Sequence, residues 1–260
     1  MTPDPRWSDL RTRLWSAAVL VAIGVAAVWI GGPVFVAVVC VSCGIMIWEA
    51  AQLHDVRYPV ALAGLATGVL AGSTVVPPAY AGAAVVALGL VAAGQARRDP
   101  VLCFMIVCWI AIGAFSMLVM RTGVGMLWIL WLICVVIASD VAGYFAGRRM
   151  GGPKFWPAVS PKKTWSGTIA GWLAAALVGA LFVAPLSWNW TLVPVSVVVG
   201  FAGQMGDIAQ SALKRRMGVK DSSSLIPGHG GVFDRFDAML GASAAALVFK
   251  IAGLLPGLSG

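Results

Sequence analysis

The chain has 260 residues and a net charge of +8; 60% of its residues are hydrophobic and only 11% are charged. A mean hydropathy of +0.92 lies far above that of soluble domains and excludes a soluble globular enzyme. The positive charge by itself would suggest a nucleic-acid partner. Its distribution along the chain indicates a membrane surface instead, so no nucleic acid is expected.

Nine apolar segments have the length and composition expected of membrane-spanning helices, which need about 18 or more apolar residues. They lie near residues 14–32, 34–51, 59–76, 81–96, 101–120, 124–145, 167–186, 191–206 and 238–256. The fourth and the eighth are short for a span. The predicted fold is all-α: a polytopic integral membrane protein with about nine transmembrane helices.

Lysine and arginine residues fall almost entirely in alternate connections between these segments. The cations of one side are Arg6, Arg11, Arg13, Arg57, Arg97, Arg98, Arg148, Arg149, Lys154, Lys162, Lys163, Lys214, Arg215, Arg216, Lys220 and Arg235. The other side carries Arg121, and Lys250 lies within the last segment. The positive-inside rule therefore predicts a cytoplasmic N-terminus and an outside C-terminus, in what we expect to be a bacterial inner membrane.

Two regions are expected within this single membrane domain. Residues 1–122 hold five spans with few polar side chains, whereas residues 123–260 hold four spans and two long cytoplasmic loops, 146–166 and 207–237. Glu49, near the end of the second span, is interpreted as a charge at a helix end with no special role. Function is expected in the C-terminal region, because charge and irregular backbone at a membrane are kept where they serve a cavity or an interface.

The loop after the sixth span contains a carboxylate and a pair of lysines. Asp140 lies near the cytoplasmic end of that span, with Tyr144 one helical turn later. An ionisable residue inside a span indicates a functional site, and the alternative is a carboxylate paired with a neighbouring arginine. Lys162 and Lys163 lie between a proline and a tryptophan, which indicates a fixed turn; otherwise they would only contact anionic head groups.

The end of the eighth span continues as a polar helix. Asp207, Ser211, Lys214 and Arg215 are at positions i, i+4, i+7 and i+8, so they share one helix face. Gly218 is expected to stop this helix.

A glycine-rich stretch, KDSSSLIPGHGGVFDRFD, follows. Its glycines allow backbone N–H groups to approach an anion, and His229 among them is expected to have a ligand or catalytic role rather than a core one. Asp234 and Asp237 lie where the chain re-enters the membrane. Carboxylates on two helix ends predict a divalent cation, for which oxygen ligands favour Mg²⁺. Together with the cations, they predict a phosphate-transfer site.

These residues resemble the signature of the CDP-diacylglycerol synthase (phosphatidate cytidylyltransferase) family. The similarity covers roughly residues 139–240 and includes Ser139, Asp140, Tyr144, Gly147, residues 160–165, Ser211, Lys214, Arg215, Lys220, Asp221, Pro227, His229, Gly230, Gly231, Asp234, Arg235 and Asp237. Ser166 stands where the family commonly has glutamate.

The resemblance implies a reaction in which phosphatidic acid and CTP give CDP-diacylglycerol and pyrophosphate. It implies catalytic roles for Asp207, Asp234, Asp237, Lys214, Arg215 and His229. The implied ligands of Mg²⁺ are Asp207, Asp234 and Asp237, with room for a second cation. The implied substrate-binding residues are Asp140, Tyr144, Lys162, Lys163, Ser211, Lys220, Asp221, Gly230, Gly231 and Arg235.

The resemblance also suggests a homodimer surrounded by membrane lipids. Gly167 and Gly171 offer a small-residue face that can pack helices. Two other functions stay open at this point. One is a different lipid-phosphate enzyme, such as a CTP-dependent polyprenol kinase. The other is a transporter or channel whose basic vestibule collects anions.

Overall fold

The structure is a computed structural model that describes residues 5–256, and side chains are described except for residues 5–13, 78 and 79. Two sequence predictions therefore involve residues outside this description: the side chains of Arg6, Arg11 and Arg13, and the C-terminal end at Gly260. All other predicted site residues lie within it.

Nine α-helices make up most of the described chain. They are α1 (Pro5–Ile30), α2 (Gly32–Leu53), α3 (Pro59–Gly72), α4 (Pro78–Gln95), α5 (Pro100–Leu118), α6 (Met126–Met150), α7 (Trp165–Val183), α8 (Leu192–Met217) and α9 (Phe233–Ile251), with a short π-helix, η1 (Val119–Val124), after α5. Proline opens α3, α4 and α5, as its fixed φ and missing N–H favour in a first turn. Each predicted segment falls on one of these helices, so the helical class is confirmed.

Five helices of the described chain are long and apolar enough to cross a membrane: Gly32–Leu53, Pro100–Val124, Met126–Met150, Trp165–Val183 and Leu192–Met217. Three further apolar helices are shorter, namely Leu14–Ile30, Pro59–Gly72 and Tyr80–Gln95. The chain is an integral membrane protein. The count of nine spans stays a prediction.

A small antiparallel hairpin interrupts the helical fold between α6 and α7. Its strands are β1 (Lys154–Trp156) and β2 (Ser160–Thr164), and Lys154 pairs with Thr164. The Thr164 hydroxyl then caps α7 by accepting a hydrogen bond from the Gly167 N–H at 3.2 Å. A fixed turn was expected around Lys162 and Lys163, whereas the structure places both lysines in strand β2.

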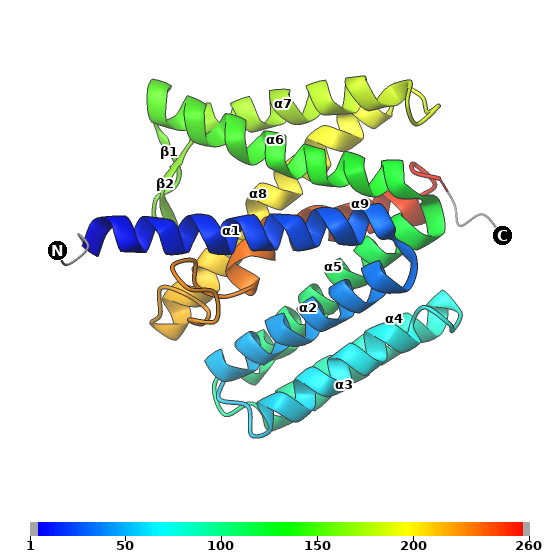
Figure 1. The fold of residues 1–260 in the computed structure, drawn as a ribbon, viewed down its shortest axis with the longest axis vertical. Coiled ribbons are helices and arrows are strands. Elements are labelled where there is room, and N and C mark those ends of the chain that lie inside the picture. Colours follow the sequence, from blue (N-terminus) through cyan, green and yellow to red (C-terminus); the bar gives the residue numbers. More distant parts are fainter. Residues whose placement is uncertain (1–4, 257–260) are drawn as a thin grey trace. The chain divides into compact units, whose positions relative to one another are not determined.

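The chain divides into two compact units, described here one at a time. The first unit contains Met1–Cys108 and Val219–Arg235, and the second contains Trp109–Gly218 and Phe236–Gly260. In the first unit α2 packs against α3, and α3 against α4 (Figure 1). Buried Phe35, Ile47 and Leu62 lie in its core. The functional division into residues 1–122 and 123–260 stays a prediction.

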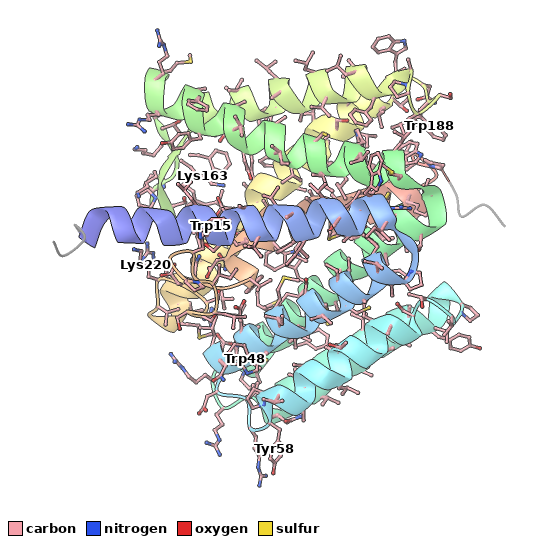
Figure 2. The ribbon with its side chains drawn as sticks, viewed as in Figure 1. Trp15, Trp48, Tyr58, Lys163, Trp188 and Lys220 are labelled. Atoms are coloured by element: carbon pink, nitrogen blue, oxygen red, sulfur yellow. The ribbon has the colours of Figure 1, made fainter. Side chains whose placement is uncertain are left out.

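The second unit is built on α6, α7 and α8, which pack against one another. In Figure 2, Lys163 and Trp188 lie near opposite ends of the α6–α7 pair. A Cβ placed at Gly167 would lie 2.6 Å from the Gly143 carbonyl oxygen, and one at Gly171 would lie 3.0 Å from that of Ser139. The predicted small-residue face is therefore buried against α6 within the chain. The homodimer stays a prediction.

Candidate active site

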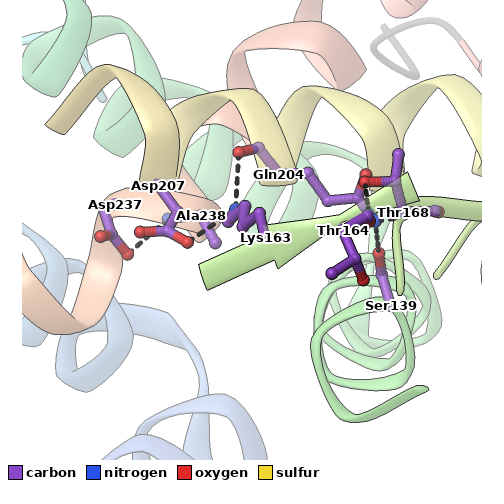
Figure 3. Close-up of polar contacts among 8 residues, drawn as sticks. All are labelled: Ser139, Lys163, Thr164, Thr168, Gln204, Asp207, Asp237 and Ala238. Atoms are coloured by element: carbon purple, nitrogen blue, oxygen red, sulfur yellow. Dashed lines mark hydrogen bonds and ion pairs between the residues drawn. The ribbon is translucent and has the colours of Figure 1, made fainter. Parts of the chain in front are cut away.

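Lys163 is the centre of a polar cluster in the second unit. On β2, Lys162 is exposed, whereas its neighbour Lys163 is half-buried. Lys163 Nζ lies 2.7 Å from Asp207 Oδ2 and donates to the Gln204 carbonyl oxygen at 3.1 Å (Figure 3). The two lysines were predicted as a pair. The structure gives them different surroundings.

Two further carboxylates interact with this ion pair. Asp140 on α6 interacts electrostatically with Lys163 and Asp207, and Asp237 on α9 does so with Asp207, Asp140 and Lys214. Asp237 is only 9% exposed, and its Oδ1 accepts a hydrogen bond from the Ala238 N–H at 2.8 Å (Figure 3). Negative charge therefore exceeds positive charge in this cluster, an arrangement that suits a bound cation.

Gln204 is a member of this cluster that the sequence analysis missed. Its Nε2 donates to Ser139 Oγ at 3.1 Å and to the Thr168 carbonyl oxygen at 3.3 Å, which ties α8 to α6 and α7 (Figure 3). Asp207 lies one turn after Gln204 on α8. The hydrogen bonds of Gln204 to α6 and α7 therefore help to position the Asp207 carboxylate that contacts Lys163. A buried amide in an apolar span was the only sequence signal for it.

The predicted polar face of α8 is present. Asp207, Ser211 and Lys214 are half-buried on one helix, and Arg215 is exposed. The helix stops at Gly218, which has φ 75° and ψ 22° and donates its N–H to the Arg215 carbonyl oxygen at 3.2 Å. The helix stop is confirmed.

The arginines after Asp140 were the alternative partners for its carboxylate. Arg148 Nη1 donates to the Tyr144 hydroxyl at 2.7 Å, on the exposed surface of α6. Among the described residues, no ion pair joins Asp140 to Arg148 or Arg149. Ser166 donates to the Gly151 carbonyl oxygen at 2.5 Å and so links the start of α7 to the end of α6.

The first unit holds a second cluster, in the glycine loop, which we define as residues 219–232 between α8 and α9. The loop and the start of α9 enclose a pocket of about 350 Å³. Its lining residues are Lys220, Asp221, Ser223, Ser224, Ile226, Gly228, His229, Gly230 and Arg235. Five predicted site residues thus meet in one pocket, with two cations and a glycine-rich backbone suited to an anion.

Asp234 organises the glycine loop. Its Oδ2 accepts hydrogen bonds from the Ser222 N–H at 2.8 Å and the Gly231 N–H at 2.9 Å, and its Oδ1 accepts one from Ser222 Oγ at 3.2 Å. Gly230 has φ +84°, and a Cβ there would lie 2.9 Å from Asp234 Oδ2. Only glycine allows both this backbone conformation and this close approach.

His229 is held in place by α1. Its Nδ1 lies 2.8 Å from Ser16 Oγ, and the Ser16 hydroxyl also donates to the Pro227 carbonyl oxygen at 3.2 Å. The His229 carbonyl oxygen accepts from Arg235 Nη2 at 2.8 Å. The ring is half-buried at the pocket, so its position fits a binding role. Ser16, an ordinary serine in an apolar helix, carried no sequence signal.

Glu49 contacts the same loop, and its interpretation as a charge without a special role is wrong. The side chain is completely buried. Its Oε1 accepts hydrogen bonds from Ser223 Oγ at 2.6 Å and the Val232 N–H at 2.9 Å, and its Oε2 accepts one from the Phe233 N–H at 2.7 Å. The partners lie more than 170 residues away, a distance in sequence that no local pattern bridges.

The donor chemistry suits Mg²⁺. Asp140, Asp207 and Asp237 carry hard carboxylate oxygens in a cluster that also contains Lys163 and Lys214. No group of three or more His, Cys, Asp or Glu side chains in the described chain forms a metal site by itself. Mg²⁺ commonly keeps water and recruits phosphate oxygens, so an incomplete protein ligand set fits it. Asp207 and Asp234 belong to different units, and their joint role as ligands stays a prediction.

Comparison with known proteins identifies the family. Residues 11–252 match the model of the cytidylyltransferase family. The chain is 34% identical over 264 aligned residues to the phosphatidate cytidylyltransferases of Brucella suis biovar 1 (strain 1330) and Brucella melitensis biotype 1, covering 93% of each chain. It is 37% identical over 145 residues, 55% of each chain, to that of Staphylococcus haemolyticus (strain JCSC1435). The chain belongs to the cytidylyltransferase family, and the predicted resemblance is confirmed.

Proposed function

We propose that this enzyme is a phosphatidate cytidylyltransferase, which transfers CMP from CTP to phosphatidic acid and releases pyrophosphate. The observation that carries the proposal is the glycine loop. Five signature residues of this loop and the start of α9 line one pocket, namely Lys220, Asp221, His229, Gly230 and Arg235. Relatives that align along 93% of the chain are phosphatidate cytidylyltransferases, which supports the same substrates here.

The reaction needs charge neutralisation more than acid–base catalysis. A phosphate oxygen of phosphatidic acid attacks the α-phosphorus of CTP, the bond from that phosphorus to the bridging oxygen breaks, and pyrophosphate leaves in line. The second pKa of a phosphate monoester is about 6, so the lipid is already a nucleophile at neutral pH. Because both reactants are anions, positioning and electrostatic stabilisation supply most of the catalysis.

The two clusters have different roles in binding the phosphates and the cation. In the pocket of the glycine loop and the start of α9, Lys220, Arg235 and backbone N–H groups bind phosphate oxygens of CTP. In the second unit, Lys163 is placed to neutralise a phosphate, and its bond to Asp207 fixes where its charge lies. Asp207 and Asp237, with Asp234, would hold Mg²⁺, which when bound neutralises phosphate charge and polarises the phosphoryl oxygen. A second cation belongs to the same proposal.

The location of the site follows from the cation distribution. We propose that both clusters work at the cytoplasmic face of a bacterial inner membrane, where CTP is available, with the N-terminus inside and the C-terminus outside. Membrane lipids would deliver phosphatidic acid laterally. A homodimer stays a prediction from the family resemblance, and the Gly167 and Gly171 face does not support it.

The test uses purified protein in detergent with phosphatidic acid, CTP and Mg²⁺, and mass spectrometry of the lipid product. CDP-diacylglycerol is expected, and chelation of the metal should abolish its formation. Parallel reactions with a polyprenol in place of phosphatidic acid should give no phosphorylated lipid. Phosphorylated polyprenol without CDP-diacylglycerol would contradict the proposal in favour of a kinase, and no metal-dependent product at all would contradict it in favour of a transporter.

A further inference from the structure

Glu49 is a completely buried carboxylate on an otherwise apolar helix, α2. A buried charge is strongly unfavourable unless hydrogen bonds or an opposite charge compensate it. In the part of the chain that the structure describes, no lysine or arginine forms an ion pair with Glu49. Its compensation comes instead from three hydrogen bonds of 2.6–2.9 Å, all donated by the glycine loop and the start of α9.

Two of these donors are main-chain N–H groups at the start of a helix. The first N–H groups of an α-helix have no partner within the helix, and its N-terminus carries partial positive charge. Val232 directly precedes α9 and Phe233 is its first residue. Glu49 therefore acts as a helix cap supplied by a distant element, and bonds between N–H groups and a charged acceptor are about twice as strong as neutral ones.

The bonds of Glu49 interleave with those of Asp234. Glu49 binds Ser223, Val232 and Phe233, whereas Asp234 binds Ser222 and Gly231. The loop is thus held at both its beginning and its end by two carboxylates. The approach is close, since a Cβ at Gly231 would lie 2.5 Å from Glu49 Oε1.

We propose that Glu49 is a positioning residue of the active site, whose carboxylate fixes the start of α9 and thereby places Asp234 and the pocket of the glycine loop. The functional part of this inference rests on the proposed cytidylyl transfer. The structural part does not, because the order of the loop is measurable without substrate.

The test variant is Glu49→Gln, which keeps the size but replaces one acceptor oxygen with an NH₂ group. At least one of the three groups that donate to Glu49 then faces the NH₂ group of the glutamine, which cannot accept a hydrogen bond. The matched control is Asp55→Asn, an exposed carboxylate of the same unit whose contact with Arg97 is 3.9 Å long. Asp55 has φ +50°, a conformation that asparagine tolerates well. Ser223→Ala removes only the hydroxyl donor and serves as a milder second variant.

Hydrogen–deuterium exchange on the full-length proteins in detergent is the first measurement. In Glu49→Gln, amides of residues 222–233 should exchange about tenfold faster or more, as expected from a lost hydrogen bond to a charged group, while peptides of α3 and α4 stay unchanged. Ser223→Ala should shift the same amides by a few-fold, and Asp55→Asn should match the original protein.

Steady-state kinetics are the second measurement. Glu49→Gln should raise KM for CTP about tenfold or more, since the pocket is no longer ordered before CTP binds. Unchanged exchange in residues 222–233 would overturn the inference. So would faster exchange along the whole chain with unchanged KM, because Glu49 would then be a general stabiliser. If Glu49→Gln cannot be purified, an unchanged loop and KM in Ser223→Ala overturn it equally. A parent protein that makes no CDP-diacylglycerol refutes the proposed function only, because exchange reports on the loop independently.

Discussion

Lys163 and Asp207 form an ion pair, with Nζ 2.7 Å from Oδ2, that joins the β-hairpin to α8. The lysine also donates to the Gln204 carbonyl oxygen one turn earlier on the same helix. These two contacts therefore hold the Lys163 ammonium group, at the end of a flexible side chain, in one position. Its charge is held at a defined point beside Asp140 and Asp207 rather than spread over the membrane surface.

This geometry predicts unequal roles for the two neighbouring lysines. Lys163→Gln should lower kcat/KM by about 10² or more, because a fixed charge that stabilises the transition state is lost. Lys162→Gln should cost less than about tenfold, since an exposed surface charge contributes little. The measurement is kcat/KM for CTP and for phosphatidic acid with purified proteins, and Arg97→Gln, an exposed arginine of the first unit, is the control. Equal losses from Lys162 and Lys163 would favour a diffuse surface-charge role.

Asp207 and Asp237 are predicted to serve the same cation site. Asparagine at either position should lower kcat by about 10²–10³ at saturating Mg²⁺, because the charge that holds the cation is removed. The double variant should be scarcely worse than the single ones, since residues that serve one ion site are not additive. Multiplied losses in the double variant would mean that the two carboxylates work separately. Yield and melting temperature in detergent check that each variant is folded.

Asp234→Asn separates a charge role from a loop-organising role. An amide oxygen at the place of Oδ2 can still accept from the Ser222 and Gly231 N–H groups, so the loop is kept while the charge is lost. If Asp234 is a metal ligand, kcat should still fall by about 10² or more. Asp221→Asn, in the same loop but exposed, should lose less than about tenfold. Near-normal turnover of a folded Asp234→Asn protein would assign Asp234 to loop structure alone.

Topology is predicted from the distribution of cations. A reporter that is active only outside the cytoplasm should be active when fused after Gly260. The same reporter inserted between Arg98 and Asp99 should be inactive, because that connection belongs to the cytoplasmic set. Activity with the reverse pattern would contradict the nine-span arrangement and place the site on the other face.

Local features were predictable from the sequence because their causes are local. Apolar runs gave the helices, and Gly218 marked the end of α8 because a left-handed residue stops a helix there. Five signature residues of the glycine loop and the start of α9 are close in sequence and meet in one pocket. The hairpin was not predicted, since its strands of three and five residues are too short to show a clear alternation.

Features that join distant elements were missed or misinterpreted. Glu49 lies 184 residues from Phe233, so nothing near it in the sequence indicates its partner. Gln204 and Ser16 are single polar residues in apolar helices, and only tertiary packing gives them partners. Gly167 and Gly171 were predicted to form a face that can pack helices, and they do so within the chain, where they let α7 approach α6.

The transfer of a cytidylyl group is the central claim, and the fate of each phosphate of CTP tests it most directly. Purified protein is incubated with phosphatidic acid, Mg²⁺ and CTP labelled at either the α- or the γ-phosphate, and the lipid phase is extracted. Label from the α-phosphate should enter the lipid and label from the γ-phosphate should leave as pyrophosphate, and Asp207→Asn should reduce the lipid label by about 10². Entry of the γ-label into lipid, or of neither label, would contradict the account.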